Sequence, residues 1–198
     1  LDVVIGKSTR SGATTSTIKK VKEISGNDTL DIISVLENSA GTIKPGTVAN
    51  PGTIKLKILT KGFTWDTPLA TTVASYGWGY SGVIPGPPAD TDFITAGMVT
   101  SPKVLDYPIN AAIIGAAPYA NPGRISFANL PIEVDDTVVK AGTELEIEIS
   151  GAEMTKQTLT VAKFVDFGLT VAEGTSKDAI AGQNGVKVGN FFINESAA

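Results

Sequence analysis

The chain has 198 residues, a formal net charge of −4, and neither cysteine nor histidine. Thiol nucleophiles, histidine general bases and zinc or copper sites built on these residues are therefore excluded. The acidic balance argues against a nucleic-acid partner, which favours a basic surface. The length suits one sizeable domain that needs no metal or disulfide to fold. We predict no cofactor and no metal site.

Glycine (21) and proline (11) are plentiful, and charged residues make up only 18%, below the ~25% of typical soluble domains. This composition is typical of loop-rich, all-β proteins that are secreted. No apolar run approaches the ~20 residues that a spanning helix needs. We therefore expect an extracellular, cell-surface protein with no membrane span.

Short apolar and β-branched runs between Gly, Pro and Asn turns predict strands along the whole chain. In chain order they cover residues 1–5, 18–24, 30–36, 53–59, 71–76, 99–105, 124–128, 143–149, 158–165, 169–172 and 186–193. Only residues 177–181 have helical character. The regular spacing of strands and turns predicts an all-β fold, an immunoglobulin-like β-sandwich.

Two strands alternate most clearly. Residues 53–59 alternate apolar side chains with lysines, and residues 143–149 alternate apolar side chains with glutamates. As neighbours, the two strands would pair opposite charges at ~0.2–1 kcal/mol each. We slightly favour the alternative, in which the charges lie on two separate solvated faces.

The chain divides into two parts. Residues 1–164 are predicted to form the sandwich domain, with an irregular insertion at about 77–123 that is rich in glycine and proline. The insertion is too apolar for a disordered linker. Residues 165–198 are predicted to form a C-terminal hairpin or donor segment that repeats the N-terminal pattern.

The repeat is most visible when Glu37 is aligned with Glu195, a separation of 195 − 37 = 158 residues. This alignment places Ile33 on Phe191 and Val35 on Ile193. Upstream, residues 165–169 are similar to residues 1–5. Chance similarity of two hairpins is the alternative.

Strands that begin a second copy would have an exposed edge unless another strand pairs with them. Either the chain belongs to a tandem array, or its tail adds to the sheet of another subunit. We predict an assembly strand with its main contacts at Val186, Val188, Phe191, Phe192 and Ile193. The partner would be a copy of the same chain, in a homo-polymer.

Three segments carry a resemblance to a known family: residues 161–171, 180–184 and 188–198. They resemble the repeat β-domains of secreted clostridial and other Gram-positive surface proteins, which often also carry a copper amine oxidase N-terminal-like (stalk) domain. Including a similar pattern after Glu37, the likeness covers residues 30–66 and 140–198. The resemblance implies a cell-envelope role. It does not imply amine oxidation, because histidine ligands and the cofactor-forming Asn-Tyr-Asp/Glu motif are absent.

An aromatic cluster supports a second function. Exposed aromatic rings beside glycines can stack on sugars or anchor an interface, which would make the chain a carbohydrate- or matrix-binding adhesion module. The candidate stacking residues are Trp65, Tyr76, Trp78 and Tyr80. Packing of these rings into the core is the alternative that we favour, because large aromatic side chains are usually buried.

Acidic loop residues could supply oxygen ligands for calcium. The candidates are Asp90, Asp92, Asp135 and Asp136, and we favour a turn at the last two. The leading hypothesis is a non-enzymatic structural protein, the self-assembling subunit of a bacterial surface filament or layer.

Overall fold

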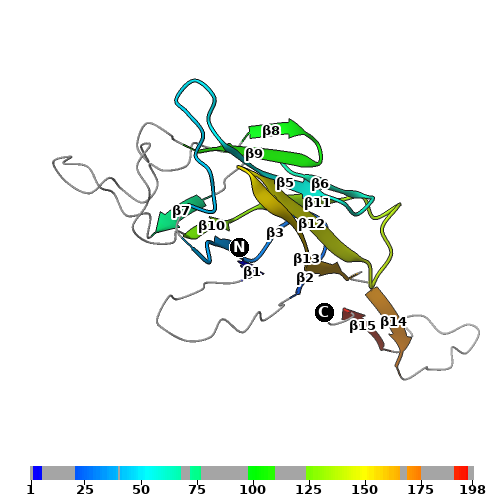
Figure 1. Ribbon diagram of the computed structural model, residues 1–198. Coiled ribbons are helices and arrows are strands. Elements are labelled where there is room, and N and C mark those ends of the chain that lie inside the picture. Colours follow the sequence, from blue (N-terminus) through cyan, green and yellow to red (C-terminus); the bar gives the residue numbers. More distant parts are fainter. Residues whose placement is uncertain are drawn as a thin grey trace, which may run out of the picture.

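The computed structural model describes residues 2–5, 21–39, 41–67, 72–76, 98–109, 124–165, 169–174 and 190–195, and within these ranges it has strands and no helix. The predicted all-β class is confirmed. The strands are β1 (Asp2–Ile5), β2 (Lys22–Ile24), β3 (Asp28–Thr29), β4 (Ile33–Leu36), β5 (Thr53–Ile58), β6 (Phe63–Trp65), β7 (Thr72–Tyr76), β8 (Met98–Ser101), β9 (Val104–Pro108), β10 (Arg124–Ala128), β11 (Pro131–Val134), β12 (Glu144–Gly151), β13 (Met154–Phe164), β14 (Leu169–Glu173) and β15 (Phe191–Glu195) (Figure 1).

The strands form four sheets. Six strands pair in the order β2-β13-β12-β5-β9-β8, four in the order β1-β4-β10-β7, three in the order β3-β11-β6, and β14 pairs with β15. All these pairings are antiparallel except that of β13 with β2. The segment 177–181, with its predicted helical character, lies outside the described residues.

The four-stranded and three-stranded sheets are closely connected. The consecutive pairs β3 and β4, β6 and β7, and β10 and β11 each contribute one strand to each sheet. Between β10 and β11, Asn129 has a left-handed backbone with φ of 55°. Next to it, the N–H of Leu30 donates to the carbonyl of Leu130 at 2.9 Å. The two sheets are therefore parts of one bent layer.

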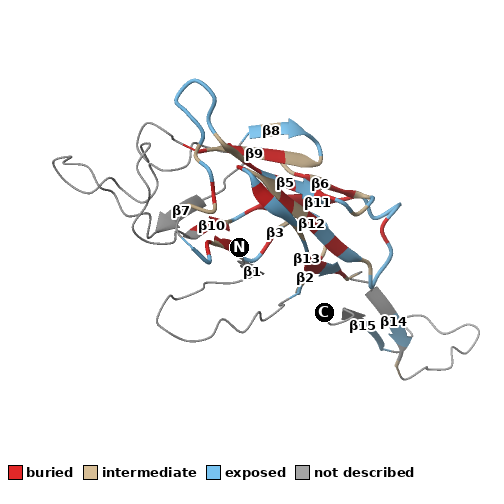
Figure 2. Cartoon of the chain, in the orientation of Figure 1, coloured by how far each residue is buried: buried red, intermediate tan, exposed pale blue. Residues whose placement is uncertain are grey.

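The six-stranded, four-stranded and three-stranded sheets share one hydrophobic core, and Figure 2 shows the buried residues along their strands. On β5 and β12, each apolar residue of the predicted alternation is buried, and the charged residues between them lie at or nearer the surface. The rings of Tyr107 on β9 and Phe127 on β10 have centroids 4.7 Å apart. This contact joins the six-stranded sheet to the four-stranded sheet inside the core.

The lysine-bearing and glutamate-bearing strands are neighbours, so the favoured prediction of two separate faces is wrong. β5 pairs with β12, and Lys57 lies opposite Glu148. The ion pairs, however, join each strand to its other neighbour. Lys55 on β5 pairs with Asp106 on β9 at 3.2 Å, and Glu148 on β12 pairs with Lys156 on β13 at 3.4 Å. Since both lysines are largely exposed, each pair contributes little to stability.

The predicted insertion at 77–123 is not irregular throughout. β8 and β9 fall inside it and form one edge of the six-stranded sheet. Leu105, Tyr107 and Ile109 from this segment are buried in the core. Residues 77–97 and 110–123 lie outside the described residues.

A tight turn with unusual backbone geometry joins β12 to β13. Gly151, Ala152 and Glu153 have φ of 93°, 45° and 60°. A Cβ at Gly151 would lie 2.0 Å from the carbonyl oxygen of Thr53, so only glycine fits there. Ala152 and Glu153 adopt a conformation that is costly for residues with a side chain.

Candidate assembly surface

The C-terminal strand pair β14–β15 carries the candidate assembly surface. Val171 lies opposite Ile193, and Ala172 lies opposite Phe192. Among the described strands, β14 and β15 pair only with each other. In Figure 1 they lie at the lower right, outside the larger sheets. An isolated two-stranded ribbon is marginally stable in water and needs a further strand or an apolar cover.

Large apolar side chains of this ribbon face solvent. Exposure reaches 69% for Val171, 65% for Phe191, 55% for Phe192 and 59% for Ile193. Side chains alternate along a strand, so Val171, Phe191 and Ile193 share one face and Phe192 lies on the other. Figure 2 shows the described part of the ribbon as exposed. The ribbon therefore exposes apolar side chains on both of its faces.

The second edge of β15 has no partner among the strands that the structure describes. β14 occupies one edge of β15, and no other described strand pairs with it. Its first three residues, Phe191, Phe192 and Ile193, carry no charge. Natural proteins protect edges with charges, prolines or bulges, and this segment has no charge or proline.

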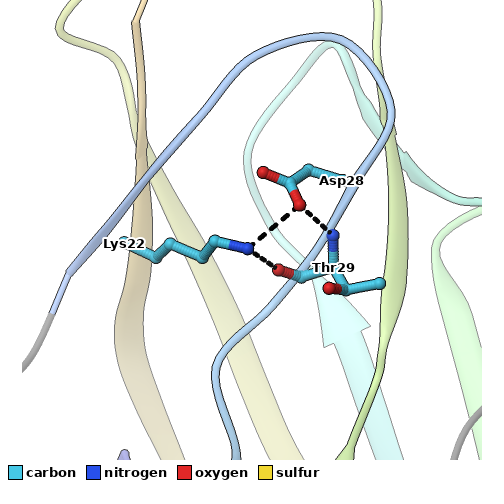
Figure 3. A network of polar contacts seen from close by, with 3 residues as sticks. All are labelled: Lys22, Asp28 and Thr29. Atoms are coloured by element: carbon cyan, nitrogen blue, oxygen red, sulfur yellow. Dashed lines mark hydrogen bonds and ion pairs between the residues drawn. The ribbon is translucent and has the colours of Figure 1, made fainter. Parts of the chain in front are cut away.

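A second edge of the molecule shows such protection. Lys22 on β2 forms an ion pair with Asp28 on β3 at 3.0 Å and donates to the carbonyl of Thr29 (Figure 3). Asp28 also accepts the N–H of Thr29 at 2.7 Å. These contacts place charge on the edge strands of the six-stranded and three-stranded sheets, in contrast to residues 191–193.

The predicted assembly residues fall in two groups. Phe191, Phe192 and Ile193 are exposed, whereas Val186 and Val188 lie outside the described residues. Within the segment 165–198, for which a hairpin or donor segment was predicted, β14 pairs with β15. The second edge of β15, which no strand in the described ranges occupies, lies beside these apolar side chains.

The strand pairing also corrects the alignment of the repeat. Residues 165–169 were expected to match residues 1–5. In the structure, the partner of β15 is Leu169–Glu173, so Leu169 takes the place of Leu1 and Val171 that of Val3. The sequence contains this signal as the shared spacing of leucine, valine and glycine at Leu1, Val3 and Gly6 and at Leu169, Val171 and Gly174.

The candidate stacking residues do not form a described surface site. Trp65 on β6 is only 3% exposed, so it packs into the core, in agreement with the favoured alternative, and it is not available for ligand stacking. Its indole N–H has no hydrogen-bond partner within the described part of the chain. Tyr76 lies on β7, and Trp78 and Tyr80 lie outside the described residues.

The acidic candidates give no cation site in the described ranges. Among the residues that the structure describes, no group of three or more acidic side chains could hold a metal ion. A carboxylate oxygen of Asp135 accepts the N–H and the hydroxyl of Thr137 at 3.1 and 2.6 Å, so Asp135 begins a turn. Asp90 and Asp92 lie outside the described residues.

No protein-family model matches the chain, and a search of curated proteins found no match. In the described ranges, the structure has no helix with the length and apolarity to cross a membrane.

Proposed function

We propose that the chain is a non-enzymatic, extracellular structural protein, a subunit of a surface filament or layer that assembles through β-strand pairing between subunits. The finer architecture that we propose is an immunoglobulin-like sandwich with a Gly/Pro-rich insertion near residues 77–123.

One observation supports this proposal most directly. The β14–β15 ribbon exposes Val171, Phe191, Phe192 and Ile193 beside a strand edge that no described strand occupies. Burying one such side chain fully is worth about 1.5–3 kcal/mol. A partner strand would cover these side chains and satisfy the open edge in the same step.

Strand addition explains how such a contact would be specific. Main-chain hydrogen bonds supply affinity, and alternate side chains fix the register. A contact between unlike surfaces of two copies does not close on itself unless its rotation forms a ring, so it generates polymers. The low content of charged residues and the abundance of strands fit a subunit of this kind.

Electron microscopy and sedimentation velocity of the purified chain over a range of concentrations test the proposal. We expect filaments or sheets for the wild type, and their loss when residues 186–198 are deleted. Ile193→Asp should also abolish assembly, whereas Val48→Asp, at a 75% exposed valine elsewhere, should not. A monomeric wild type at all concentrations, or normal polymers from the deletion variant, would contradict the proposal.

A further inference from the structure

The β14–β15 pair repeats the pairing of β1 with β4. In the first pair, Val3 lies opposite Val35, and in the second, Val171 lies opposite Ile193. The shifts are 171 − 3 = 168 on the first strand and 193 − 35 = 158 on the second. With these two shifts, every residue pair of β1–β4 becomes a residue pair of β14–β15. The two ribbons are therefore counterparts.

The surroundings of the two ribbons differ. On its other edge β4 pairs with β10, where Ile125 lies opposite Val35 and Phe127 lies opposite Ile33. Ile33 and Val35 are fully buried. Their counterparts Phe191 and Ile193 are more than half exposed. Among the described strands, β15 therefore lacks a neighbour equivalent to β10, which pairs with the second edge of β4 and covers its apolar side chains.

We propose that this strand is β10 of a second copy of the chain, which the β14–β15 ribbon reaches by taking the place of the β1–β4 ribbon. The proposal rests on the proposed function, because it names the acceptor of the same assembly strand. In one molecule, β10 already pairs with β4 and β7, so the acceptor edge opens only when β1 and β4 leave together. The exchange places Ile193 opposite Ile125 and Phe191 opposite Phe127.

The exchange keeps most of the apolar burial along β10. It exposes Ile33 and Val35 of the acceptor and buries Phe191 and Ile193 of the donor, which are larger side chains at the same positions. Each chain has one donor ribbon and one acceptor edge, and these are different surfaces. Successive exchanges therefore extend an open chain of subunits.

Two positions fit poorly: Glu173 is the counterpart of Ile5, and Phe192, the second, makes the proposal testable. Phe192 is the counterpart of Ser34, whose buried hydroxyl lies 2.8 Å from that of Ser126 on β10. In the exchanged sheet, Phe192 must occupy the space of a serine, and Ser126 loses this hydrogen bond. Phe192→Ser restores the serine pair. Exchange therefore predicts that this loss of an exposed apolar ring strengthens assembly, whereas packing of apolar ribbons against one another predicts that it weakens assembly.

A disulfide that locks β4 to β10 provides the first test. The chain has no cysteine, and the two hydroxyl oxygens are close enough that Ser34→Cys with Ser126→Cys should form one disulfide. We expect the oxidised double variant to be monomeric and the reduced form to assemble. Ser34→Cys alone, treated with the same oxidant, is the control and should assemble in both states.

The second test compares critical concentrations by sedimentation velocity. We expect Phe192→Ser to lower the critical concentration about fivefold, because one net hydrogen bond changes an equilibrium constant by about this factor. Normal assembly of the oxidised lock, or weaker assembly of Phe192→Ser, would overturn the exchange while the proposed function stood. A wild type that never assembles would instead contradict the proposed function.

Discussion

Ser34 and Ser126 lie opposite each other on β4 and β10, and their hydroxyl oxygens are 2.8 Å apart in a buried site. Two polar side chains thus meet between two apolar residue pairs, Ile125 with Val35 and Phe127 with Ile33. The pair fixes which residue of β4 faces which residue of β10, because a shift by one residue would leave each hydroxyl against an apolar side chain.

Removing one hydroxyl of this pair should destabilise the fold. A buried polar group that loses its partner costs about 1–3 kcal/mol, so Ser34→Ala and Ser126→Ala should each lower the free energy of unfolding by an amount in this range. The double variant should lose less than the sum of the two. Urea unfolding of the four proteins gives the coupling energy, and strictly additive losses would show that the two hydroxyls do not interact.

The buried carboxylate of Glu37 should stabilise the loop that follows β4. Glu37 is 5% exposed, and its Oε1 accepts the N–H of Ile43 at 2.7 Å. Glu37→Ala leaves that N–H without its acceptor and should cost about 1–3 kcal/mol. Glu37→Gln keeps a carbonyl acceptor and should cost less.

The control for Glu37 is Glu133→Ala, at an exposed position on β11. It should change the free energy of unfolding by less than about 0.5 kcal/mol. Equal urea midpoints for Glu37→Ala and Glu133→Ala would contradict a structural role for the Glu37 carboxylate.

The turn between β12 and β13 offers a substitution that should stabilise the protein. Glu153 is exposed and has φ of 60°, a conformation that glycine adopts without strain. Glu153→Gly should therefore raise the free energy of unfolding by about 0.5–1 kcal/mol, less the entropy that glycine adds to the unfolded chain. Thr155→Gly, two residues further on in β13, should lower it. Thermal unfolding of both variants measures whether each substitution raises or lowers the stability of the protein.

The sequence predicts the long strands well because their side chains alternate. The apolar residues of the two predicted alternations are buried, at positions 54, 56 and 58 and at positions 145, 147 and 149. The short strands β3, β6 and β11 were not predicted, because two to four residues carry no periodic signal and form by pairing with neighbours. The adjacency of β5 and β12 is likewise a property of topology, which alternation within one strand does not specify.

The candidate site was predicted in part. Phe191, Phe192 and Ile193 were identified from the repeat, and they are exposed. The strand β14 was predicted at 169–172, but the alignment of the repeat was placed four residues too early, because residues 165–169 are also similar to residues 1–5. The pairing of Val171 with Ile193 selects the later alignment, which the shared spacing of leucine, valine and glycine also supports. The burial of Trp65 agrees with the alternative favoured from the sequence, because large aromatic side chains are usually buried.

The two counterpart ribbons should respond oppositely to the same substitution. Val35→Ser and Ile33→Ser remove fully buried apolar groups and should each cost about 2–4 kcal/mol of unfolding free energy. Ile193→Ser and Phe191→Ser, at the matching positions of β15, alter side chains that are more than half exposed and should cost less than about 0.5 kcal/mol. Urea unfolding at a concentration below assembly measures all four. Large losses at residues 191 and 193 under those conditions would mean that their side chains are already covered within one molecule, and that the apolar surface assigned to assembly does not exist in solution.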